Sequence, residues 1–330
     1  MTLSKEVLLE VESLSESMKQ GKLRSSYEMA MKTLSILKTH VKSNDWRLAS
    51  QLIQDSKEIS RLLKKASETV PQNMILRALK SIRDRGREET ALEMMDIMSS
   101  FQEEEDIPLD RDYILGLFEE WEAEMEVSAE NIAKEALKHI VNDEVILTLG
   151  SSKTVESFLK KAAAKRSFSV IVAEGAPFCH GHDMAINLTM VNELTVIPDS
   201  AIMTVLSRVT KVIIGTHSVT ANGGLKAVSG SYALALAAKH HSVPLIVLAA
   251  MFKYTPEFIV SHEQSSFNKI VSPMALLQDN NRDIEVINPV FDYVPPELVT
   301  VLIAGEKEGH SPSYVYHKLS TLYHRKDYLE

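Results

Sequence analysis

The sequence is short of several features that mark whole classes of proteins. It has a single cysteine, Cys179, which excludes an internal disulfide framework and fits a reducing compartment. No apolar run reaches the ~18 residues that a membrane-spanning helix needs, and the first residues lack the apolar core of a signal peptide. The net charge is -9, whereas nucleic-acid binding requires a basic face. We therefore expect a cytosolic protein whose main partner is neither a membrane nor nucleic acid.

Glycine-rich nucleotide-binding signatures are also missing. No GxGxxG pattern follows any apolar run, which argues against a dinucleotide site. The segment GSSKT at 150–154 is similar to the end of a P-loop, but the first glycine of that motif is absent and a serine precedes the lysine. An apolar run, a small polar loop and a helix start follow one another here, which makes a candidate anion site. We predict that no cofactor is bound.

Residues 1–140 have the pattern of a helical domain. Apolar side chains recur at steps of three and four residues, and no strand-like alternation interrupts them. Ser25 and Glu28 have the spacing of a helix-capping pair. Residues 84–112 differ, because they are rich in charge and include an acidic cluster at 103–106. We interpret this stretch as a solvated, partly disordered connection, and an acidic contact surface for a basic partner is the alternative.

The hydrophobic period changes at residue 145. Short apolar runs follow, each too short for an independent helix: VILTL, SVIVA, LTVI, KVII and PLIVLA. Helical stretches separate some of them, at 153–165, 199–208 and 229–241. Such alternation predicts a mainly parallel sheet that is covered by helices on both faces. The sequence thus indicates an α/β protein with an N-terminal all-helical domain, residues 1–140, followed by an α/β domain, residues 141–330.

The most informative stretch is 209–250, where a strand, a loop and a helix lead into a second strand. The loop contains Asn222, Gly223 and Gly224. It lies at the carboxyl end of a predicted strand, where open α/β sheets bind their ligands. His217 in this loop could be a general acid or base near neutral pH, or a hydrogen-bonded loop residue. The residues alone leave both interpretations open.

Metal-ligand side chains gather in one segment, CHGHD, which holds Cys179, His180, His182 and Asp183. A zinc site with an open position needs three protein ligands that converge on one point. These four residues lie in one turn, and no second ligand pair stands out elsewhere. We therefore interpret the segment as a structural turn and helix start, and predict no metal. A nucleophilic role for Cys179 would need a base and an oxyanion site that the sequence does not place.

Several segments together resemble a known family. They are RSSYEMAMKTLSILK, AEGAPFCHGHDMA, KVIIGTHSV, ANGGLKAVSG and NPVFDYVPPELVT, and the similarity extends from about residue 24 to residue 323. These segments are similar to the alpha, beta and delta regulatory subunits of eukaryotic translation initiation factor 2B, and within that family to the beta branch. The family is related to sugar-phosphate isomerases. The resemblance implies a helical domain followed by a Rossmann-like α/β domain, in agreement with the hydrophobic pattern.

The isomerase relatives carry a pattern of catalytic groups: a cysteine after the first strand, an acidic residue in a G-A-D loop and an arginine in an E-x-R-P turn. In this sequence the corresponding positions fall near Gly150, on His217 and on Ala176. The resemblance thus implies that the thiolate, the carboxylate and the phosphate-binding guanidinium are all lost. The scaffold positions that persist are Asn222, Gly223, Asp292 and the adjacent prolines Pro295 and Pro296. We interpret the isomerase pocket as vestigial.

The resemblance implies a non-catalytic regulatory subunit of the guanine-nucleotide exchange factor for translation initiation factor two. The implied partners are the alpha, gamma, delta and epsilon subunits, in a decamer with two copies of each subunit. Exchange belongs to the epsilon subunit, helped by gamma. The beta and delta subunits hold the alpha subunit of factor two and sense its phosphorylation, which controls translation initiation in the integrated stress response. Such recognition requires large apolar interfaces.

Individual contact residues are implied only by alignment with the family. Glu120 matches a position near the bound partner subunit. Asp143, Ser169 and Thr195 match positions at the two-fold interface between beta and delta, where the family can carry a regulatory small-molecule pocket. Ordinary surface residues are the alternative. Two other functions stay open: an active isomerase of the methylthioribose- or ribose-phosphate type, and a homo-oligomeric metabolite-binding module.

Overall fold

The computed structural model describes residues 3–23, 25–43, 49–64, 66, 68–94, 110–259, 267–277, 284–306 and 308–328. The chain forms two compact units, one made of Met1–Met125 with His317–Glu330 and the other of Glu126–Tyr316. The division falls inside helix α5 (Arg111–Lys134). The first unit is helical and the second is an α/β unit. The predicted fold class is therefore confirmed.

The helical unit contains α1 (Lys5–Lys19), α2 (Ser26–Ser43), α3 (Ala49–Lys64), α4 (Thr69–Met94) and the first part of α5. Each of α1, α2 and α3 buries one stripe of side chains, as the three- and four-residue spacing predicts. Ser25 caps α2, because its hydroxyl accepts a hydrogen bond from the Glu28 N–H at 3.3 Å. The predicted capping position is thus confirmed.

The charged stretch at 84–112 is helical at its two described ends, where we predicted a partly disordered connection. Helix α4 continues to Met94, and α5 begins at Arg111. Residues 85–94 are mostly Arg, Glu, Ala, Leu and Met, which have high helix propensity and account for the extension of α4. The acidic cluster at 103–106 lies outside the described residues.

The end of the chain groups with the helical unit, whereas we predicted it within the α/β domain. Helix α11 (Val315–Leu322) is followed by a short turn, η7 (Arg325–Asp327). Arg83 of α4 donates to both carboxylate oxygens of Asp327, from Nη2 at 2.8 Å and from Nε at 3.1 Å. Lys80 of α4 donates to the Ser320 carbonyl at 3.3 Å. These long-range contacts join the chain's last residues to the helical unit.

The α/β unit is built on a six-stranded parallel sheet with the order β3-β2-β1-β4-β7-β9. Its strands are β1 (Val145–Leu149), β2 (Ser169–Ala173), β3 (Glu193–Ile197), β4 (Lys211–Gly215), β7 (Leu245–Leu248) and β9 (Val301–Ile303). This is the strand order of doubly wound dinucleotide-binding folds, with the direction of winding reversed between β1 and β4. The predicted apolar runs match all of these strands except β9, which has only three residues.

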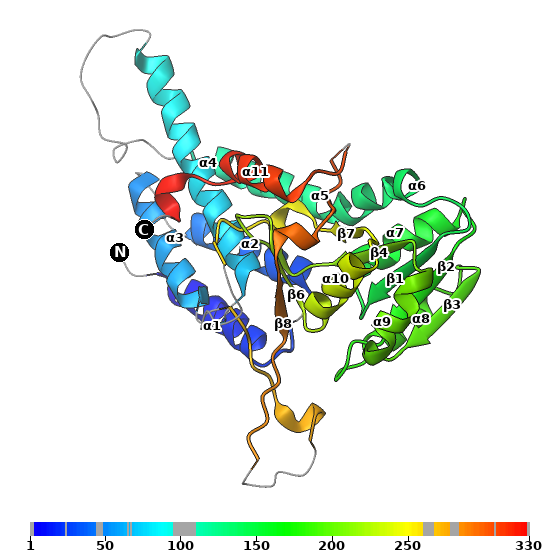
Figure 1. Cartoon of the computed structure of the whole chain (residues 1–330). Helices are drawn as coiled ribbons and strands as arrows, with labels where there is room; N and C mark the ends of the chain where they lie inside the picture. Colours follow the sequence, from blue (N-terminus) through cyan, green and yellow to red (C-terminus); the bar gives the residue numbers. More distant parts are fainter. Residues whose placement is uncertain are drawn as a thin grey trace. The chain divides into compact units, whose positions relative to one another are not determined.

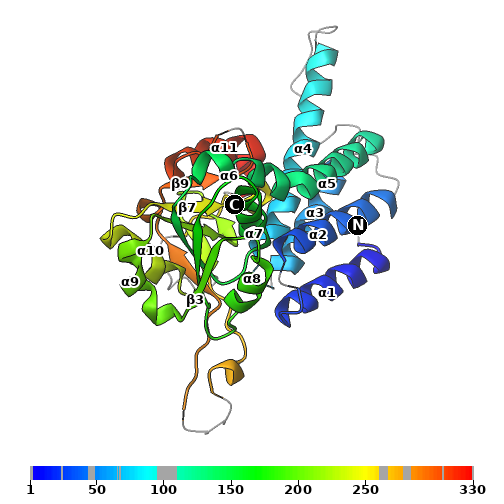
Figure 2. The ribbon, with the colours of Figure 1, turned by 90° about the vertical axis from the view of Figure 1, so that its right-hand side faces the viewer.

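Helices cover both faces of this sheet (Figures 1 and 2). In Figure 2, α7 (Lys153–Ala163) and α8 (Gly181–Asn187) lie on one side of the sheet, and α9 (Ile202–Val205) and α10 (Ser231–His240) lie on the other. Because both faces are covered, most strands are buried along their length, and β3 at the edge is the exception.

A second, antiparallel sheet was not predicted. The strands β5 (Ser218–Val219) and β6 (Leu225–Val228) form a hairpin between β4 and α10, and β8 (Phe291–Val294) pairs with β6. Strands of two to four residues are too short to show a clear alternation of apolar and polar side chains. The glycine-rich loop that we predicted at the carboxyl end of β4 is therefore the turn of a hairpin.

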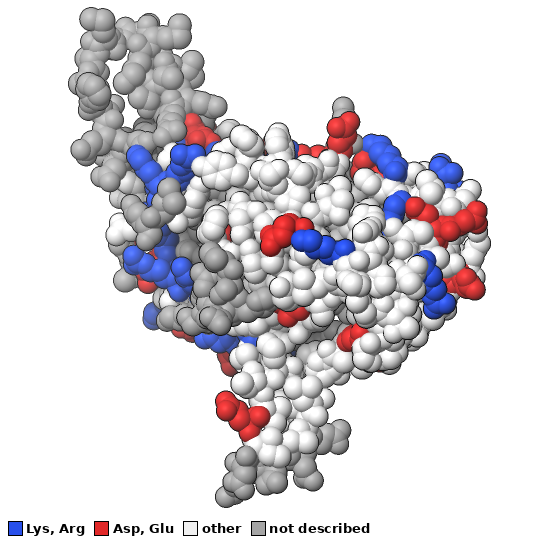
Figure 3. All heavy atoms as spheres, in the orientation of Figure 1, with Lys and Arg blue, Asp and Glu red and all other residues white. Residues whose placement is uncertain are grey.

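No described helix is both long and apolar enough to cross a membrane. On the face shown in Figure 3, the acidic and basic side chains of the α/β unit are interspersed and separated by broad uncharged surface. No continuous basic stripe crosses the described residues of that unit on this face.

Candidate functional site

Parallel strands bring their carboxyl ends to one edge of a sheet, and the positions implied by the isomerase relatives lie in the loops at this edge. Gly150 follows β1, Ala176 lies in the loop after β2, and His217 lies in the loop after β4. The first two loops touch, since a Cβ added to Gly175 would lie 3.1 Å from the Cα of Gly150. The edge thus has the strand and loop arrangement of a ligand site, without a thiol, carboxyl or guanidinium group at the three aligned positions.

Gly150 and Ala176 contribute backbone groups. Gly150 has a φ of +62°, and its N–H donates to the Ala173 carbonyl at 3.0 Å. Asp199, just after β3, accepts hydrogen bonds from the N–H groups of Gly175 at 2.9 Å and Ala176 at 2.7 Å. The loop after β2 is therefore fixed by a carboxylate from the neighbouring strand.

His217 is half-buried against the second sheet. Its N–H donates to the Lys226 carbonyl at 2.9 Å, and its ring centroid lies 4.7 Å from that of Phe291. The hydroxyl oxygen of the preceding Thr216 lies 2.9 Å from the carbonyl oxygens of both Ser218 and Lys226. The backbone of His217 is thus held by a hydrogen bond and its ring packs on Phe291, and a role of the imidazole as general acid or base stays a prediction.

Two lysines lie behind this loop. Lys226 is buried, and its Nζ lies 4.8 Å from the ring centroid of Phe291 and 5.5 Å from that of Phe267. Lys253, after β7, donates from Nζ to the Thr216 carbonyl at 2.9 Å. Burial lowers the pKa of the Lys253 amine to about 8, because the charged form loses its hydration. Both amines therefore take part in contacts within the chain.

The turn formed by Asn222, Gly223 and Gly224 is shaped by packing. Asn222 donates from Nδ2 to the Tyr293 hydroxyl at 2.7 Å and accepts at Oδ1 from the Gly224 N–H at 3.1 Å. A Cβ at Gly223, whose φ is +82°, would lie 2.4 Å from the Pro312 carbonyl oxygen. A Cβ at Gly224 would lie 2.6 Å from the Tyr293 ring. The two glycines are thus required by the chain's own residues, without any ligand.

At two helix starts near this edge, a side chain of the same chain accepts hydrogen bonds from backbone N–H groups. Asp292 accepts at Oδ2 from the N–H groups of Gly230 at 2.8 Å and Tyr232 at 3.0 Å, at the start of α10. Ser152 accepts at Oγ from the Val155 N–H at 3.5 Å, at the start of α7. Asp292, one of the retained scaffold positions, is therefore a helix-capping residue in this fold. The anion site at 150–154 stays a prediction.

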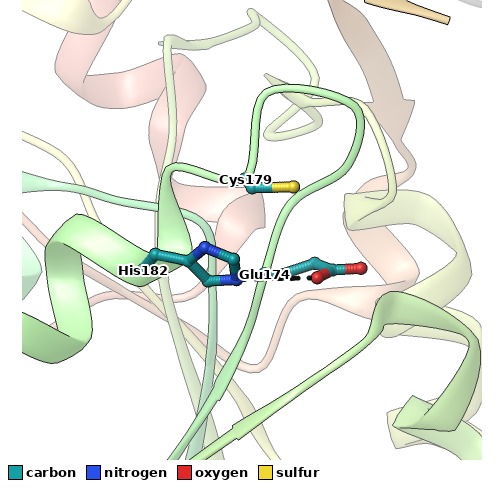
Figure 4. Close-up of side chains that lie close together, drawn as sticks. All are labelled: Glu174, Cys179 and His182. Atoms are coloured by element: carbon teal, nitrogen blue, oxygen red, sulfur yellow. Dashed lines mark ion pairs between the residues drawn. The ribbon is translucent and has the colours of Figure 1, made fainter.

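The loop after β2 brings together three side chains of metal-ligand type, Glu174, Cys179 and His182 (Figure 4). One potential ligand atom from each residue lies within 4.8 Å of the other two. Nε2 of His182 is 3.6 Å from a carboxylate oxygen of Glu174. His182 is exposed, whereas Glu174 and Cys179 are half-buried.

Of the CHGHD residues, Cys179 and His182 take part in this cluster and two do not. His180 stacks on the Phe178 ring at a centroid distance of 5.8 Å and lies 4.0 Å from the Asp183 carboxylate. Glu174 was missed because it lies outside the CHGHD segment. A signal was present, since Glu174 follows the SVIVA run and so stands at the carboxyl end of a predicted strand.

The remaining predicted positions lie away from this edge. Asp143 is in the turn before β1 with a φ of +64°, and Ser169 begins β2, where its hydroxyl donates to Glu193 at 2.9 Å. Both stand at the amino ends of the strands. Thr195 is exposed in the middle of the edge strand β3, and Glu120 is exposed on α5 in the helical unit. Their functional roles stay predictions.

Comparison with known proteins identifies relatives that cover most of this chain. The family model described as "Initiation factor 2 subunit family" matches residues 22–306. The translation initiation factor eIF2B subunit beta of Dictyostelium discoideum is 46% identical over 212 residues, which are 63% of this chain and 54% of that protein. Ribose 1,5-bisphosphate isomerase of Pyrococcus furiosus is 27% identical over 314 residues, which are 93% of this chain and 92% of that protein. The chain thus spans about half the length of the eIF2B subunit beta that it matches.

Two solved structures share the fold of the whole chain. The crystal structure of eIF2B beta from Chaetomium thermophilum has a TM-score of 0.78 at 26% identity, covering 97% of this chain and 94% of that one. A chain of the tetrameric eIF2B-beta2-delta2 complex from C. thermophilum has a TM-score of 0.75 at 25% identity, covering 96% and 95%. The predicted resemblance is confirmed, and because the family model matches far more than half of the sequence, the chain belongs to the Initiation factor 2 subunit family.

Proposed function

We propose that this chain is a beta-type, non-catalytic regulatory subunit of the guanine-nucleotide exchange factor for translation initiation factor two. It assembles with alpha, gamma, delta and epsilon subunits in a decamer with two copies of each, and it acts in the cytosol. It helps to hold the alpha subunit of factor two and to sense its phosphorylation. Family membership and the similarity to eIF2B beta proteins support this proposal.

The observation that carries the proposal is the exposed surface around β3, the edge strand of the sheet (Figure 2). Val196 in this strand is 43% exposed, and large apolar side chains are also exposed on the flanking segments, namely Ile186, Met190 and Met203. An unpaired strand edge beside exposed apolar side chains is the surface that a subunit interface covers. We assign Thr195, and with it Asp143 and Ser169 on the adjoining turn and strand, to such an interface.

The isomerase alternative requires chemical groups that the aligned positions do not supply. Gly150, Ala176 and His217 replace the expected thiol, guanidinium and carboxyl groups, and the contacts of His217 are within the chain. The similarity to the Pyrococcus furiosus isomerase is then a shared scaffold. Incubation of the purified chain with ribose 1,5-bisphosphate or 5-methylthioribose 1-phosphate tests this directly. Turnover that is lost in His217→Ala would overturn the proposal.

Co-expression with the other four exchange-factor subunits, followed by purification through a tag on this chain, tests the assembly. We expect all four to be recovered with the wild-type chain. Val196→Arg places a charge on the edge strand and should abolish recovery of the delta subunit. Val127→Arg is the matched control, because Val127 is 45% exposed but lies on α5. Absence of the four subunits from the wild-type preparation would contradict the proposal.

A second experiment addresses the partner contact predicted for Glu120. Binding of the assembled exchange factor to the alpha subunit of factor two is measured with Glu120→Lys and with Glu119→Lys. Both residues are exposed and adjacent on α5, yet they point in directions about 100° apart around the helix. We expect affinity to fall at least fivefold for Glu120→Lys and to stay within twofold for Glu119→Lys. An equal loss of affinity in the two variants would contradict the assignment of Glu120 to the partner contact.

A further inference from the structure

We propose that Glu174, Cys179 and His182 form a zinc-binding site with one open coordination position. The site lies in the loop between β2 and α8, at the carboxyl edge of the sheet (Figure 4). It goes beyond the proposed regulatory function and uses none of the residues assigned to subunit or factor contacts.

The separations of the three side chains suit a metal ion. In a tetrahedral zinc site, bonds of 2.0–2.3 Å place ligand atoms roughly 3.3–3.8 Å apart. The imidazole Nε2 of His182 and the carboxylate of Glu174 are already 3.6 Å apart. With the thiol of Cys179 included, the ligand atoms lie within 4.8 Å of one another. A contraction of at most about 1 Å therefore completes the set, and side-chain rotation can supply it, because none of the three residues is fully buried.

The backbone that carries the three ligands is fixed by its own hydrogen bonds. The Cys179 N–H donates to the Gly175 carbonyl at 2.9 Å, and the His182 N–H donates to the Cys179 carbonyl at 3.1 Å. The Gly181 N–H donates to the Glu174 carbonyl at 2.8 Å. Each ligand residue thus takes part in a hydrogen bond that links it to another part of the loop. A site on a fixed loop needs little ordering when the metal binds.

Two backbone features hold the cysteine and the histidine near the end of β2. A Cβ on Gly181 would lie 2.5 Å from the Ala173 carbonyl oxygen, so only glycine lets α8 begin this close to the strand. Cys179 has a φ of +53°, which non-glycine residues rarely adopt. Such a conformation persists where the surroundings impose it, and it is frequent at ligand sites. Here it accompanies the convergence of the thiol with the carboxylate and the imidazole.

The donor set selects the type of metal. Calcium and magnesium take oxygen ligands, whereas a thiolate and an imidazole favour zinc and similar ions. Three protein ligands leave the fourth position of a tetrahedral zinc ion to water or to a group from a partner. Binding converts the Cys179 thiol to a thiolate and releases its proton to solvent. The structure thus points to an open zinc site instead of a closed structural one.

The experiment uses the purified full chain, freed of metal with a chelator and then titrated with Zn²⁺ or Co²⁺. We expect one metal ion per chain after gel filtration. Bound Co²⁺ should show thiolate-to-cobalt charge-transfer absorption together with the visible bands of tetrahedral cobalt. Because the chain has a single cysteine, both this absorption and the rate of thiol alkylation report on Cys179 alone. Zinc should slow that alkylation at least tenfold.

Variants distinguish a built site from a chance cluster. Cys179→Ser should abolish the charge-transfer absorption, and Glu174→Gln and His182→Asn should each weaken zinc binding at least tenfold. His180→Asn is the matched control, because His180 lies in the same loop but outside the cluster, and it should bind zinc within twofold of wild type. Far-ultraviolet circular dichroism confirms that each variant is folded.

Three results would overturn the zinc proposal. The first is no stoichiometric metal after gel filtration, and the second is an equal loss of zinc affinity in His180→Asn and His182→Asn. The third is an unchanged rate of Cys179 alkylation in the presence of zinc. None of them bears on recovery of the exchange-factor subunits. Conversely, a failed subunit recovery leaves the zinc measurement intact, so the two proposals fail separately.

Discussion

Two loops leave the same edge of the six-stranded sheet and use their polar side chains in opposite ways. Between β4 and α10, the chain folds into a hairpin whose histidine, asparagine and lysine side chains contact the chain itself. Between β2 and α8, the loop leaves a carboxylate, a thiol and an imidazole close together, with the imidazole at the surface. The difference shows that a position at the carboxyl edge does not define a site. The packing of the loop that follows each strand decides which side chains remain available.

The largest expected effect is on the hairpin turn. Gly223→Ala combines a φ of +82° with a Cβ placed 2.4 Å from the Pro312 carbonyl oxygen. We expect it to lower the free energy of unfolding by about 3 kcal/mol. Urea denaturation followed by circular dichroism measures this. Gly150→Ala is the control, because Gly150 has a φ of +62° but an added Cβ would meet open space. Its free energy of unfolding should fall by about 1 kcal/mol. Equal losses would show that packing on Pro312 does not shape the turn.

Removal of the cap on α10 should have a smaller effect. Asp292→Ala leaves the N–H groups of Gly230 and Tyr232 without their carboxylate acceptor. We expect a loss of about 1–2 kcal/mol in the free energy of unfolding. Asp292→Asn keeps one oxygen acceptor, so its free energy of unfolding should fall clearly less than that of Asp292→Ala. If the two variants behave alike, the carboxylate does not act as a cap.

The pH dependence of stability tests whether the Lys253 amine is buried behind the hairpin. Its pKa is lowered from the ordinary 10.5 to about 8, so the folded state loses this proton before the unfolded state does. Between pH 8 and 10.5 the unfolded state therefore binds more protons, and stability rises with pH. Below pH 8 the cost of burying the charge is fully present. Relative to Lys253→Met, the wild-type chain should gain about 1 kcal/mol from pH 8 to pH 9. A parallel pH profile for both chains would contradict this burial.

The smallest effect is expected in the loop after β2. His182→Ala removes the contact between an exposed imidazole and the Glu174 carboxylate, and such contacts contribute little at a surface. In the presence of a chelator, the free energy of unfolding should change by less than about 0.5 kcal/mol. Thermal denaturation of the metal-free chain measures it. A loss above about 1.5 kcal/mol would mean that the cluster serves stability, which would remove the contrast between the two loops.

The strands of the main sheet could be predicted because of where they lie. β1, β2, β4 and β7 are buried along nearly their whole length, so their sequences read as continuous apolar runs. The second sheet escaped prediction because β5 and β6 together span only a few residues on either side of a turn. The end of the chain was assigned to the α/β domain, since nothing near Asp327 in the sequence indicates its contact with Arg83.

The candidate site was predictable only in part. Gly150, Ala176 and His217 were found through the resemblance, and the structure places them in loops at one edge as parallel strands require. Which residues would pack against His217 and against the turn at Gly223 was not predictable, because Phe291 and Pro312 lie far away in the sequence. Glu174 was overlooked for a related reason. It is separated from Cys179 by a loop whose path depends on Asp199 after another strand.

The sequence by itself determined the helical and α/β regions, the main parallel strands and the family, because these depend on local periodicity and on motifs that are read residue by residue. The tertiary structure alone decided which side chains meet. It paired Arg83 with Asp327, closed the hairpin around His217, and brought Glu174 to Cys179 and His182. The physical reason is that such contacts depend on the register and connection of strands and helices, which local patterns do not encode.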